Sequence, residues 1–567
     1  MALAHGLKQM TARYEELLGR LRQAFPAPVS DPVHDGYVVF SLLKALDRVD
    51  ALKSQAPILG TPRDPDYEAA TAAGIAENGR PLEEVISELV RCLDGMLIFG
   101  HPRSQVNVVA HPSIASIVGV VLPSMYNPNL CSDESGRGFS EAEVRVASIV
   151  ARMIGYDPGQ AGGLFTFGGT GTLLYGVKIG LEKACPGTLQ HGVCQEAVVL
   201  ASQQSHYACL NVTGWLGIGQ EHVIRVPTLS DNSVDLQALD AAARSVIEAG
   251  KRIAAVVATI GTTDAFGLDD LAGVHELRER WISDYELDYR PHLHADAVIG
   301  WAWSAFNEYD FAVNPLGFRG RTLRALAAAQ NRVRHLPLAD SLGIDFHKTG
   351  FAPYISSMFL LRDRHDFRMI VRERETMPYL FHSGEFHPGM FSLETSRSAT
   401  GVMAALANLL LLGREGFCSL LGHAVDMAEL LRETIIARPE LTTLNDENVG
   451  PVTLFRAYPS GVDTFRVKKR EQSDPGFREQ LQGYNEFNRR IFQRVHSEAL
   501  AGRGVAIGFT DSYRQSDYGE PIVALKSYVL SPYVDASRMR AIVDHVLEAR
   551  REVESELSAS DERSPTS

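Results

Sequence analysis

The segment RIAAVVATIGTT, residues 252–263, decides the fold that the sequence predicts. Its continuous run of Ile, Val and Ala is typical of a strand buried on both faces of a sheet, and a polar Gly-Thr-Thr follows. Helical patterns separate it from three similar runs: EAVVLASQQSHY (196–207), HVIRVPTL (222–229) and YRPHLHADAVIG (289–300). This alternation predicts a parallel sheet covered by helices. Because ligands bind at the carboxyl ends of such strands, the polar residues there are the candidate site.

The composition of the whole chain is that of a globular protein. Its 567 residues are 45% hydrophobic and 22% charged, with a formal net charge of -14. Binding to nucleic acid or to anionic membranes needs basic patches, so we expect neither partner. The longest apolar run, GVMAALANLLLLG (401–413), is too short to cross a bilayer and predicts a buried helix.

The N-terminus and the cysteines both favour a cytoplasmic location. The first residues, MALAHGLKQMTARYEELLGRL, carry charges throughout and lack the apolar region of a signal peptide. The cysteines are scattered, form no C-x-x-C pair and are expected to be reduced thiols: Cys92, Cys131, Cys185, Cys194, Cys209 and Cys418.

Four regions follow from the patterns along the chain. Residues 1–100 are predicted to be a mostly helical segment. Residues 101–395 carry the strand–helix alternation and are predicted to form the large ligand-binding domain. Residues 396–555 combine a long apolar helix with further alternation, which predicts a small α/β domain, and the polar residues 556–567 are expected to be disordered.

A Gly/Thr-rich turn opens a helix in GGLFTFGGTGTLLYGVKIGLEKA (162–184). Glycines let the backbone approach a ligand closely, and the free N–H groups of a helix start attract anions. Gly169 and Thr170 are therefore candidates for holding a phosphate, although a simple helix cap is the other interpretation. The turn has neither the Lys of a Walker loop nor the spacing of a dinucleotide site.

A second candidate is the strand HLHADAVIG (292–300), which places His292, His294 and Asp296 on one face. Three interpretations are open. Imidazoles and a carboxylate suit zinc or manganese, Asp296 alone suits a basic ring nitrogen, and the histidines could simply be hydrogen-bonded in the core. Ala297 stands where metallohydrolases usually carry a further His, which disfavours the metal.

A third candidate is Lys348, at the end of the strand in ADSLGIDFHKTG (339–350). A desolvated lysine shifts its pKa readily, and the neutral amine forms Schiff bases with carbonyls. The ordinary alternative is a strand-end lysine whose charged tip reaches solvent. A phosphate-binding turn, a strand-end carboxylate and a strand-end lysine, in this order, are the groups that hold pyridoxal 5'-phosphate (PLP).

Seven segments resemble, in order, those of the PLP-dependent group II amino-acid decarboxylases, a family with glutamate, aromatic amino-acid and tyrosine/aspartate decarboxylases. The likeness covers residues 95–400 well and the rest loosely. The segments are GHPRSQVN (100–107), FTFGGTGTLL (165–174), ASQQSHYACLNVTGWLGIG (201–219), IGTTDAFGLDDL (260–271), HADAVIG (294–300), ADSLGIDFHKTG (339–350) and ETSRSA (394–399). The resemblance implies an α/β fold of the PLP-dependent transferase type I, with a large mostly parallel-sheet domain, and a homodimer.

The resemblance also implies roles for individual residues. Lys348 carries the Schiff base, Asp296 pairs with the pyridine nitrogen, His206 stacks on the cofactor ring and Val298 packs on its other face. Gly169 and Thr170 hold the phosphate with help from Ser341 and His347, Thr262 or Thr263 lies near the ring hydroxyl or Asp296, and His294 supports the strand that ends at Asp296.

Several positions depart from the family pattern and leave the substrate open. Val298 stands where the family usually has Ala, Phe346 where it has Pro, Thr349 where it has Trp, and Ser104 where a Phe is common at the substrate mouth. Lys526 stands where many members have an Arg for the substrate carboxylate, so a cation is kept without the bidentate fork.

The expected activity is decarboxylation of an L-amino acid to its amine and CO2 through a Lys348 Schiff base. Tyr379, in the loop RERETMPYLFHSGEFHPG (372–389), is the candidate acid that returns a proton to Cα, and Tyr354 is a second candidate close to the ring and substrate. The alternatives are another fold-type I PLP reaction (aminotransferase, lyase or carbanion oxidase), and a protein without PLP: a metal enzyme or a binding module.

Overall fold

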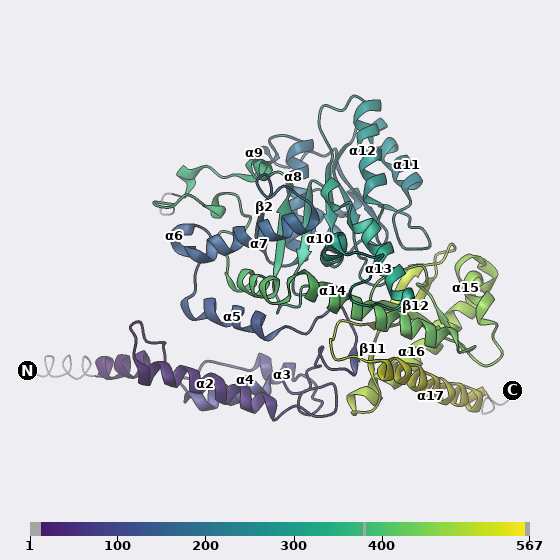
Figure 1. Ribbon diagram of the computed structural model, residues 1–567, viewed down its shortest axis with the longest axis horizontal. Helices are drawn as coiled ribbons and strands as arrows, with labels where there is room; N and C mark the ends of the chain where they lie inside the picture. The colour runs from purple at the N-terminus through teal and green to yellow at the C-terminus, as the bar shows by residue number, and fades with distance from the viewer. Residues whose placement is uncertain (1–12, 378–380, 562–567) are drawn as a thin grey trace, which may run out of the picture. The chain divides into compact units, whose positions relative to one another are not determined.

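The computed structural model describes residues 13–377 and 381–561. The chain divides into two compact units, one formed by the described part of Met1–Ile98 with Glu498–Arg503 and the other by Phe99–Ser497 with the described part of Gly504–Ser567 (Figure 1). Each unit is described by itself.

The first unit is helical. Its main helices are α2 (Pro32–Asp50), α3 (Tyr67–Thr71) and α4 (Leu82–Arg91). Helix α2 begins after Asp31, whose side chain accepts hydrogen bonds from the N–H groups of Val33 and His34. Glu83 of α4 forms ion pairs with Lys44 and Arg48 of α2, at 2.8 and 2.9 Å.

A seven-stranded sheet forms the centre of the second unit. Its strands lie in the order β2-β8-β7-β6-β5-β3-β4. Strands β4, β3, β5, β6 and β7 run parallel, and β8 is antiparallel to both β7 and β2. The bounds are β2 Gly162–Thr166, β3 Ala197–Ser202, β4 Val223–Val226, β5 Arg252–Thr259, β6 His292–Asp296, β7 Ser341–Asp345 and β8 Ser357–Leu361.

Helices cover both faces of this sheet, which explains why its strands are apolar throughout. Alternate residues of β5 belong to different hydrophobic clusters: Ala255 and Val257 pack with Leu173 of α8, whereas Val256 packs with Leu239 of α11. The helices of this region are α5 Ile114–Tyr126, α6 Asp133–Gly136, α7 Gly138–Ile154, α8 Gly169–Ala184, α9 Thr188–His191, α10 Ala208–Trp215, α11 Leu236–Glu248, α12 Leu271–Asp284 and α13 Gly320–Val333.

Helix α8 lies very close to the sheet. A Cβ atom at Gly180 would lie 2.3 Å from the carbonyl oxygen of Ala254, and one at Gly176 would lie 2.5 Å from the ring of His294. Only glycine therefore permits this approach, which sets the start of α8 against the carboxyl ends of β6 and β7.

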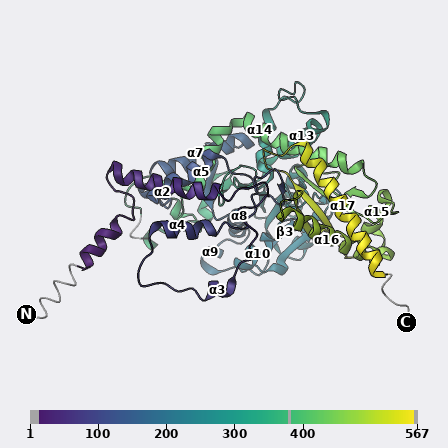
Figure 2. The same ribbon diagram turned by 90° about the horizontal axis from the view of Figure 1, so that it is seen from below.

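A smaller five-stranded sheet, in the order β1-β11-β12-β10-β9, forms the C-terminal part of the same unit. Its strands are β1 Ser104–Gln105, β9 Leu441–Thr443, β10 Val452–Ala457, β11 Ala506–Gln515 and β12 Pro521–Tyr528. The helices packed with it are α14 Thr400–Ile436, α15 Thr464–Ser473, α16 Arg478–Leu500 and α17 Ala536–Asp561. Helices α16 and α17 lie side by side in both views (Figure 1, Figure 2), with Ile491 and Val543 in one hydrophobic cluster.

Helix α14 contains the apolar run from residue 401, yet it is much longer than the predicted buried helix. Among the described helices of 18 residues or more, it is the one whose length and composition would allow it to cross a membrane. Gly413 leaves helical geometry inside it, with φ 55° and ψ -172°. Many side chains before and after Gly413 are buried in the core, which is typical of an internal helix.

Two expectations from the sequence are wrong. Cys185 and Cys194, nine positions apart, form a disulfide that closes the loop containing α9, whereas reduced thiols were expected. The scattered spacing gave no hint of this because the end of α8 and the start of β3 bring the two cysteines together only in the fold. The tail from residue 556 is helical as far as Asp561, since α17 continues to that residue.

Candidate active site

The carboxyl ends of β3, β6 and β7 bring three of the predicted residues together: His206, Asp296 and Lys348. Asp296 affects the pKa of both His206 and Lys348, and each of these affects the pKa of Asp296. Residues separated by 142 positions in the sequence therefore form one electrostatic cluster. Its position at the ends of the parallel strands is the one that this type of sheet uses for ligands.

Lys348 follows β7 and forms an ion pair with Asp345, at 2.9 Å between Nζ and Oδ2. Burial alone would lower the pKa of Lys348, but the carboxylates of Asp345 and Asp296 outweigh that effect and raise it. The amine is thus held as an ammonium in the protein chain alone. The expectation that it is desolvated and neutral omitted this partner.

Asp345 is the main residue that the sequence reasoning missed. It is 1% exposed, and Ser357 donates a hydrogen bond to its Oδ1 at 2.6 Å. Burial would raise its pKa, but Lys348 and His347 together lower it. The signal was present in the alternation of β7, because Ser341, Gly343 and Asp345 share one face of the strand.

Asp296 ends β6 and is 8% exposed. Burial raises its pKa, and Lys348 and His206 oppose that effect. Its Oδ1 atom is buried and has no hydrogen-bond partner among the described residues. A carboxylate oxygen in this position is suited to accept a hydrogen bond from a ligand N–H.

His206 lies on the loop after β3, four residues beyond Ser202. Its Nδ1 accepts a hydrogen bond from the N–H of Ala208 at 3.1 Å. Burial lowers the pKa of His206, which favours the neutral imidazole. A neutral ring with one fixed nitrogen is suited to stack on a flat ligand, as predicted for this residue.

The predicted phosphate-binding turn begins α8 at Gly169, after Gly168 with φ 114°. No side chain caps this helix start, so its backbone N–H groups are not taken by a capping residue. A Cβ atom at residue 169 would lie 3.0 Å from Oδ2 of Asp345 and 3.1 Å from Cγ1 of Val298. Gly169 and Val298 therefore lie beside the Lys348–Asp345 pair, and Thr170 follows on the same turn.

His347 and Tyr354 also lie near the Lys348–Asp345 pair. The two rings are 4.0 Å apart between centroids, and Nε2 of His347 lies 3.5 Å from Oδ2 of Asp345. Burial lowers the pKa of His347. Tyr354 is 57% exposed, and its pKa is raised by partial burial and by Asp345.

Ser341 does not join this cluster, which corrects its assignment to the phosphate. Its hydroxyl lies 2.8 Å from Nε2 of His292 and 2.8 Å from Nδ1 of His294, all buried. Since His294 lies against Gly176 of α8, Ser341 is about 10 Å along the helix from Gly169, at 1.5 Å per residue. The hydroxyl is therefore occupied in the core.

The same contacts decide between the interpretations of the H-x-H-x-D motif, residues 292–296. Burial lowers the pKa of His294 to about 3 and holds that of His292 well below its ordinary value, so both rings are neutral. Both bind Ser341 rather than Asp296. These contacts support the core interpretation of the two histidines.

The loop after β5 holds Thr262 and Thr263 next to Asp296, because the N–H of Ile260 donates to the carbonyl oxygen of Asp296 at 2.9 Å. The hydroxyl of Thr262 accepts a hydrogen bond from the N–H of Gly267 at 2.8 Å. Thr262 is thereby occupied within its own loop. Thr263, which is only partly buried, stays the freer of the two predicted residues.

Lys526, on β12, is 6% exposed and pairs with Asp264 at 2.8 Å. The second oxygen of Asp264 accepts a hydrogen bond from Thr510 at 3.0 Å. Asp264 was also missed by the sequence reasoning, although it follows Thr263 directly. A substrate carboxylate would have to replace Asp264 to reach Lys526.

The departures from the family pattern lie mostly outside the cluster. Phe346 is fully buried and stacks on Phe165, and the buried Thr349 donates to the carbonyl oxygen of Ile299. Ser104 is buried on β1. Tyr379 lies outside the described residues.

These residues fit pyridoxal 5'-phosphate. The unpartnered Oδ1 of Asp296 suits a pyridinium N–H, the start of α8 suits a phosphate, and His206 and Val298 suit the two faces of a ring. Lys348 supplies an amine within the same cluster.

Comparisons with known proteins agree with this reading. The family described as "Pyridoxal-dependent decarboxylase conserved domain" matches residues 65–457. L-2,4-diaminobutyrate decarboxylase of Acinetobacter baumannii is 25% identical over 495 residues, 84% of this chain and 86% of that protein. Aromatic-L-amino-acid decarboxylase of Bacillus atrophaeus is 24% identical over 433 residues, 75% of this chain and 81% of that protein.

Solved structures share the fold. The structure of Oryza sativa TDC with PLP and tryptamine has a TM-score of 0.73 at 17% identity, and it covers 93% of this chain and 100% of that chain. Rhodiola rosea 4-hydroxyphenylacetaldehyde synthase has a TM-score of 0.70 at 16% identity, covering 92% and 99%. Since the family match spans well over half of the sequence, the chain belongs to the pyridoxal-dependent decarboxylase family, with the α/β fold of PLP-dependent enzymes of fold type I.

Proposed function

We propose that Lys348, Asp296 and His206 are the core of the catalytic site in this chain. As a member of its family, the chain is a PLP-dependent carboxy-lyase that decarboxylates an amino acid. The observation that supports the residue assignment is the cluster of Lys348, Asp296 and His206 at the strand ends, with one oxygen of Asp296 unpartnered.

PLP, when bound, supplies an electron sink for the electron pair left behind when the carboxylate departs as CO2. Lys348 provides the amine that attaches the cofactor covalently. Asp296, held at the end of β6, would keep a proton on the ring nitrogen by accepting its hydrogen bond. His206 and Val298 would hold the ring, and the N–H groups at Gly169 and Thr170 would bind the phosphate.

Asp345 is the ion-pair partner of Lys348 whenever the lysine amine is not bonded to the cofactor. The ammonium then lies 2.9 Å from the Asp345 carboxylate instead of being left unpaired. Tyr354 is a candidate to deliver a proton to Cα, because its partly exposed phenol lies beside His347, next to Lys348 in the chain. Tyr379 stays a second candidate for this step.

The proposed substrate rests on the names of similar proteins. Two similar relatives, from Acinetobacter baumannii and Rhizobium meliloti, are named L-2,4-diaminobutyrate decarboxylase. We therefore place L-2,4-diaminobutyrate first among candidate substrates.

The decisive experiment incubates the PLP-loaded protein with a panel of L-amino acids and measures CO2 and the amine together. The panel contains diaminobutyrate, aspartate, glutamate, tyrosine, tryptophan and lysine. Equal amounts of CO2 and amine are expected, with diaminobutyrate the fastest. An aldehyde product, as the name of the Rhodiola rosea relative would suggest, or a keto acid with retained CO2, would favour another reaction of the same fold.

We further propose a homodimer in the cytoplasm that acts without membrane or nucleic acid. Exposed apolar side chains on α2 support the dimer, since Val33, Phe40 and Leu46 are 85%, 60% and 64% exposed. Light scattering after size-exclusion chromatography tests it, and a monomeric mass would contradict it. Cell fractionation followed by immunodetection tests the location.

A further inference from the structure

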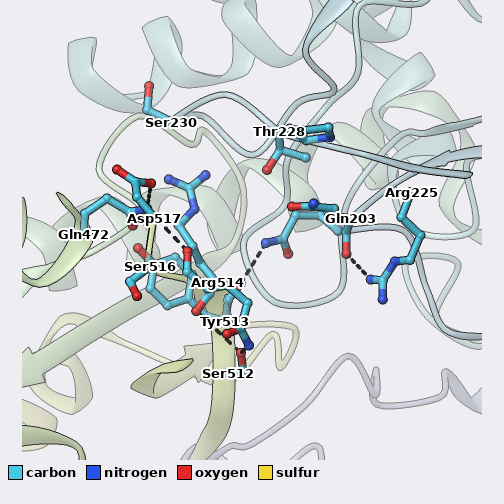
Figure 3. A pocket seen from close by; sticks show the side chains of 13 residues that line it. Gln203, Arg225, Thr228, Ser230, Gln472, Ser512, Tyr513, Arg514, Ser516 and Asp517 are labelled. Carbon is cyan, nitrogen blue, oxygen red and sulfur yellow. Dashed lines mark hydrogen bonds between the residues drawn. The ribbon is translucent and has the colours of Figure 1, made fainter. Parts of the chain in front are cut away.

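A hollow at the β4 edge of the large sheet lies apart from the residues of the active site. We call it the β4-edge cavity; its lining includes Gln203, Arg225, Thr228, Ser230, Arg514 and Asp517 (Figure 3). Its volume is about 970 Å³, at the upper end of the range of about 300–1,000 Å³ that small-molecule sites occupy. It forms where the ends of β3 and β4 meet the end of β11.

Two arginines give this cavity its charge. Arg225 donates from Nη2 to the carbonyl oxygen of Gln203, and Arg514 donates to the carbonyl oxygen of Leu229 at 2.6 Å and to Asn232 at 3.1 Å. In the described parts of the chain, no carboxylate forms an ion pair with either arginine. Figure 3 shows the two side chains on opposite sides of Gln203 in this view.

The hydrogen bonds fix the guanidinium groups without neutralising them. A guanidinium has five N–H donors, so Arg225 and Arg514 each keep donors for a ligand. The acidic residue of the lining, Asp517, already accepts a hydrogen bond from Gln472 at 2.8 Å. The other lining side chains with polar tips, such as Thr228 and Gln203, are uncharged.

We infer that the β4-edge cavity binds a small organic polyanion whose phosphate or carboxylate groups contact Arg225 and Arg514. Planar, fixed guanidinium groups recognise both kinds of oxyanion through paired N–H donors. The volume is large enough for an organic molecule rather than a single inorganic ion. A polar lining in which Arg225 and Arg514 outnumber the acidic Asp517 disfavours a cation or an apolar ligand.

The cavity connects to the active site through residues of both. Arg225 also lines a second, smaller cavity of about 50 Å³, together with His206 and Cys209. Gln203 and Gln204 precede His206 by two or three residues on the same loop, and Gln204 donates to the carbonyl oxygen of Tyr513 at 2.9 Å. An anion bound at Arg225 therefore acts on the loop that positions His206, which makes this an effector site.

The test is isothermal titration calorimetry of the PLP-loaded protein, in which the phosphate position at Gly169 is already filled. The probes are inorganic pyrophosphate, citrate and, as a cation, spermidine. We expect saturable binding of at least one anion, one per chain, and none of spermidine. Pyrophosphate alone would identify a phosphate ligand, and citrate alone a carboxylate ligand. Binding of neither anion overturns the inference.

Matched variants locate the binding. Arg225→Gln and Arg514→Gln are each expected to weaken the affinity at least ten-fold, and Asp517→Asn to strengthen it, because a negative charge leaves the lining. Arg489→Gln removes an arginine that pairs with Asp511 and is not part of the cavity lining, and should leave the affinity unchanged. If Arg514→Gln folds poorly, the anion affinities of Arg225→Gln and Asp517→Asn test the inference. Unchanged affinity in both overturns the inference.

The effect on the active site is read separately. Saturating anion is expected to change the visible absorbance of the bound cofactor in the parent protein and not in Arg225→Gln. An anion that binds in the cavity and leaves the spectrum unchanged would overturn the effector role.

Discussion

The carboxyl edge of the large sheet has two very different ends. Beneath the active site, at β6 and β7, Asp296 and Asp345 are buried and their charges act directly on Lys348. At β3 and β4, Arg225 is exposed and Arg514 is half-buried, and both bind only uncharged oxygen atoms. The same strand-end geometry thus supports a tightly coupled charge cluster at one place and separate, accessible charges at the other.

The two places differ in how far solvent reaches the charged groups at the strand ends. Low-dielectric surroundings strengthen the interaction of charges, so a change to one buried group shifts the pKa of its neighbours. Solvent screens charges at the edge, and each acts more independently there. Substitutions in the buried cluster should therefore have large and linked effects.

The largest effect is expected for Lys348→Ala. Without the amine, the cofactor has no covalent attachment, so decarboxylation should fall by about 1,000-fold or more. The visible absorbance band of the PLP-loaded protein, which borohydride should bleach in the parent, should be missing. A coloured, borohydride-sensitive Lys348→Ala protein would show that another lysine holds the cofactor.

Asp296→Asn should follow, with a loss of about 100-fold or more in kcat and a smaller change in cofactor affinity. The amide preserves the shape but no longer stabilises a protonated ring nitrogen. Rapid-mixing kinetics and an absorbance titration with PLP measure the two quantities. Asp296→Glu, which restores the charge, is the matched control, and equal losses in both variants would contradict an electrostatic role.

Asp345→Asn should lower the pKa of Lys348 and destabilise the cofactor-free protein by about 1–3 kcal/mol. The raised pKa of Lys348 gives stability that is present below the unfolded pKa of about 10.4 and lost as pH rises through the folded value. The lowered pKa of Asp345 gives stability that is present above about 3.9 and lost as pH falls through its folded value. The difference between parent and variant should thus be largest near neutral pH.

Denaturant unfolding at several pH values measures this difference. Acylation of Lys348 at neutral pH, followed by mass spectrometry, reports the pKa of its amine. Faster acylation is expected in Asp345→Asn, since more of the amine is neutral. Ser357→Ala removes the hydroxyl that donates to Asp345 and serves as the control; an acylation rate unchanged in Asp345→Asn would contradict the ion pair.

The smallest effect on the cofactor is expected for Ser341→Ala. Its hydroxyl binds His292 and His294 in the core, so PLP affinity should stay within about two-fold while unfolding becomes easier by about 1–3 kcal/mol. Equilibrium dialysis and denaturant unfolding check the two parts. A marked loss of PLP affinity in Ser341→Ala would show that Ser341 does contribute to phosphate binding.

Much of this arrangement was predictable. The order of motifs pointed to Lys348, Asp296, His206 and the turn at Gly169, because each lies at the end of a strand or a few residues after it. The parallel sheet followed from the apolar runs, such as residues 252–259. The predictions failed for Ser341, for the disulfide of Cys185 and Cys194, and for the partners Asp345 and Asp264.

The sequence by itself determined the strands, their burial on both faces and the chemical groups at their ends, since these depend on local patterns of residue type. Only the tertiary structure decided which groups meet. Strand alternation assigns Ser341 and Asp345 to one face, but the fold places Ser341 against two histidines of β6, and Asp345 beside Gly169 of α8 and Lys348. Likewise, β11 lies against the ends of β3 and β4, although it is nearly 300 residues away in the sequence. The cavity that forms between them is not predicted by any local pattern.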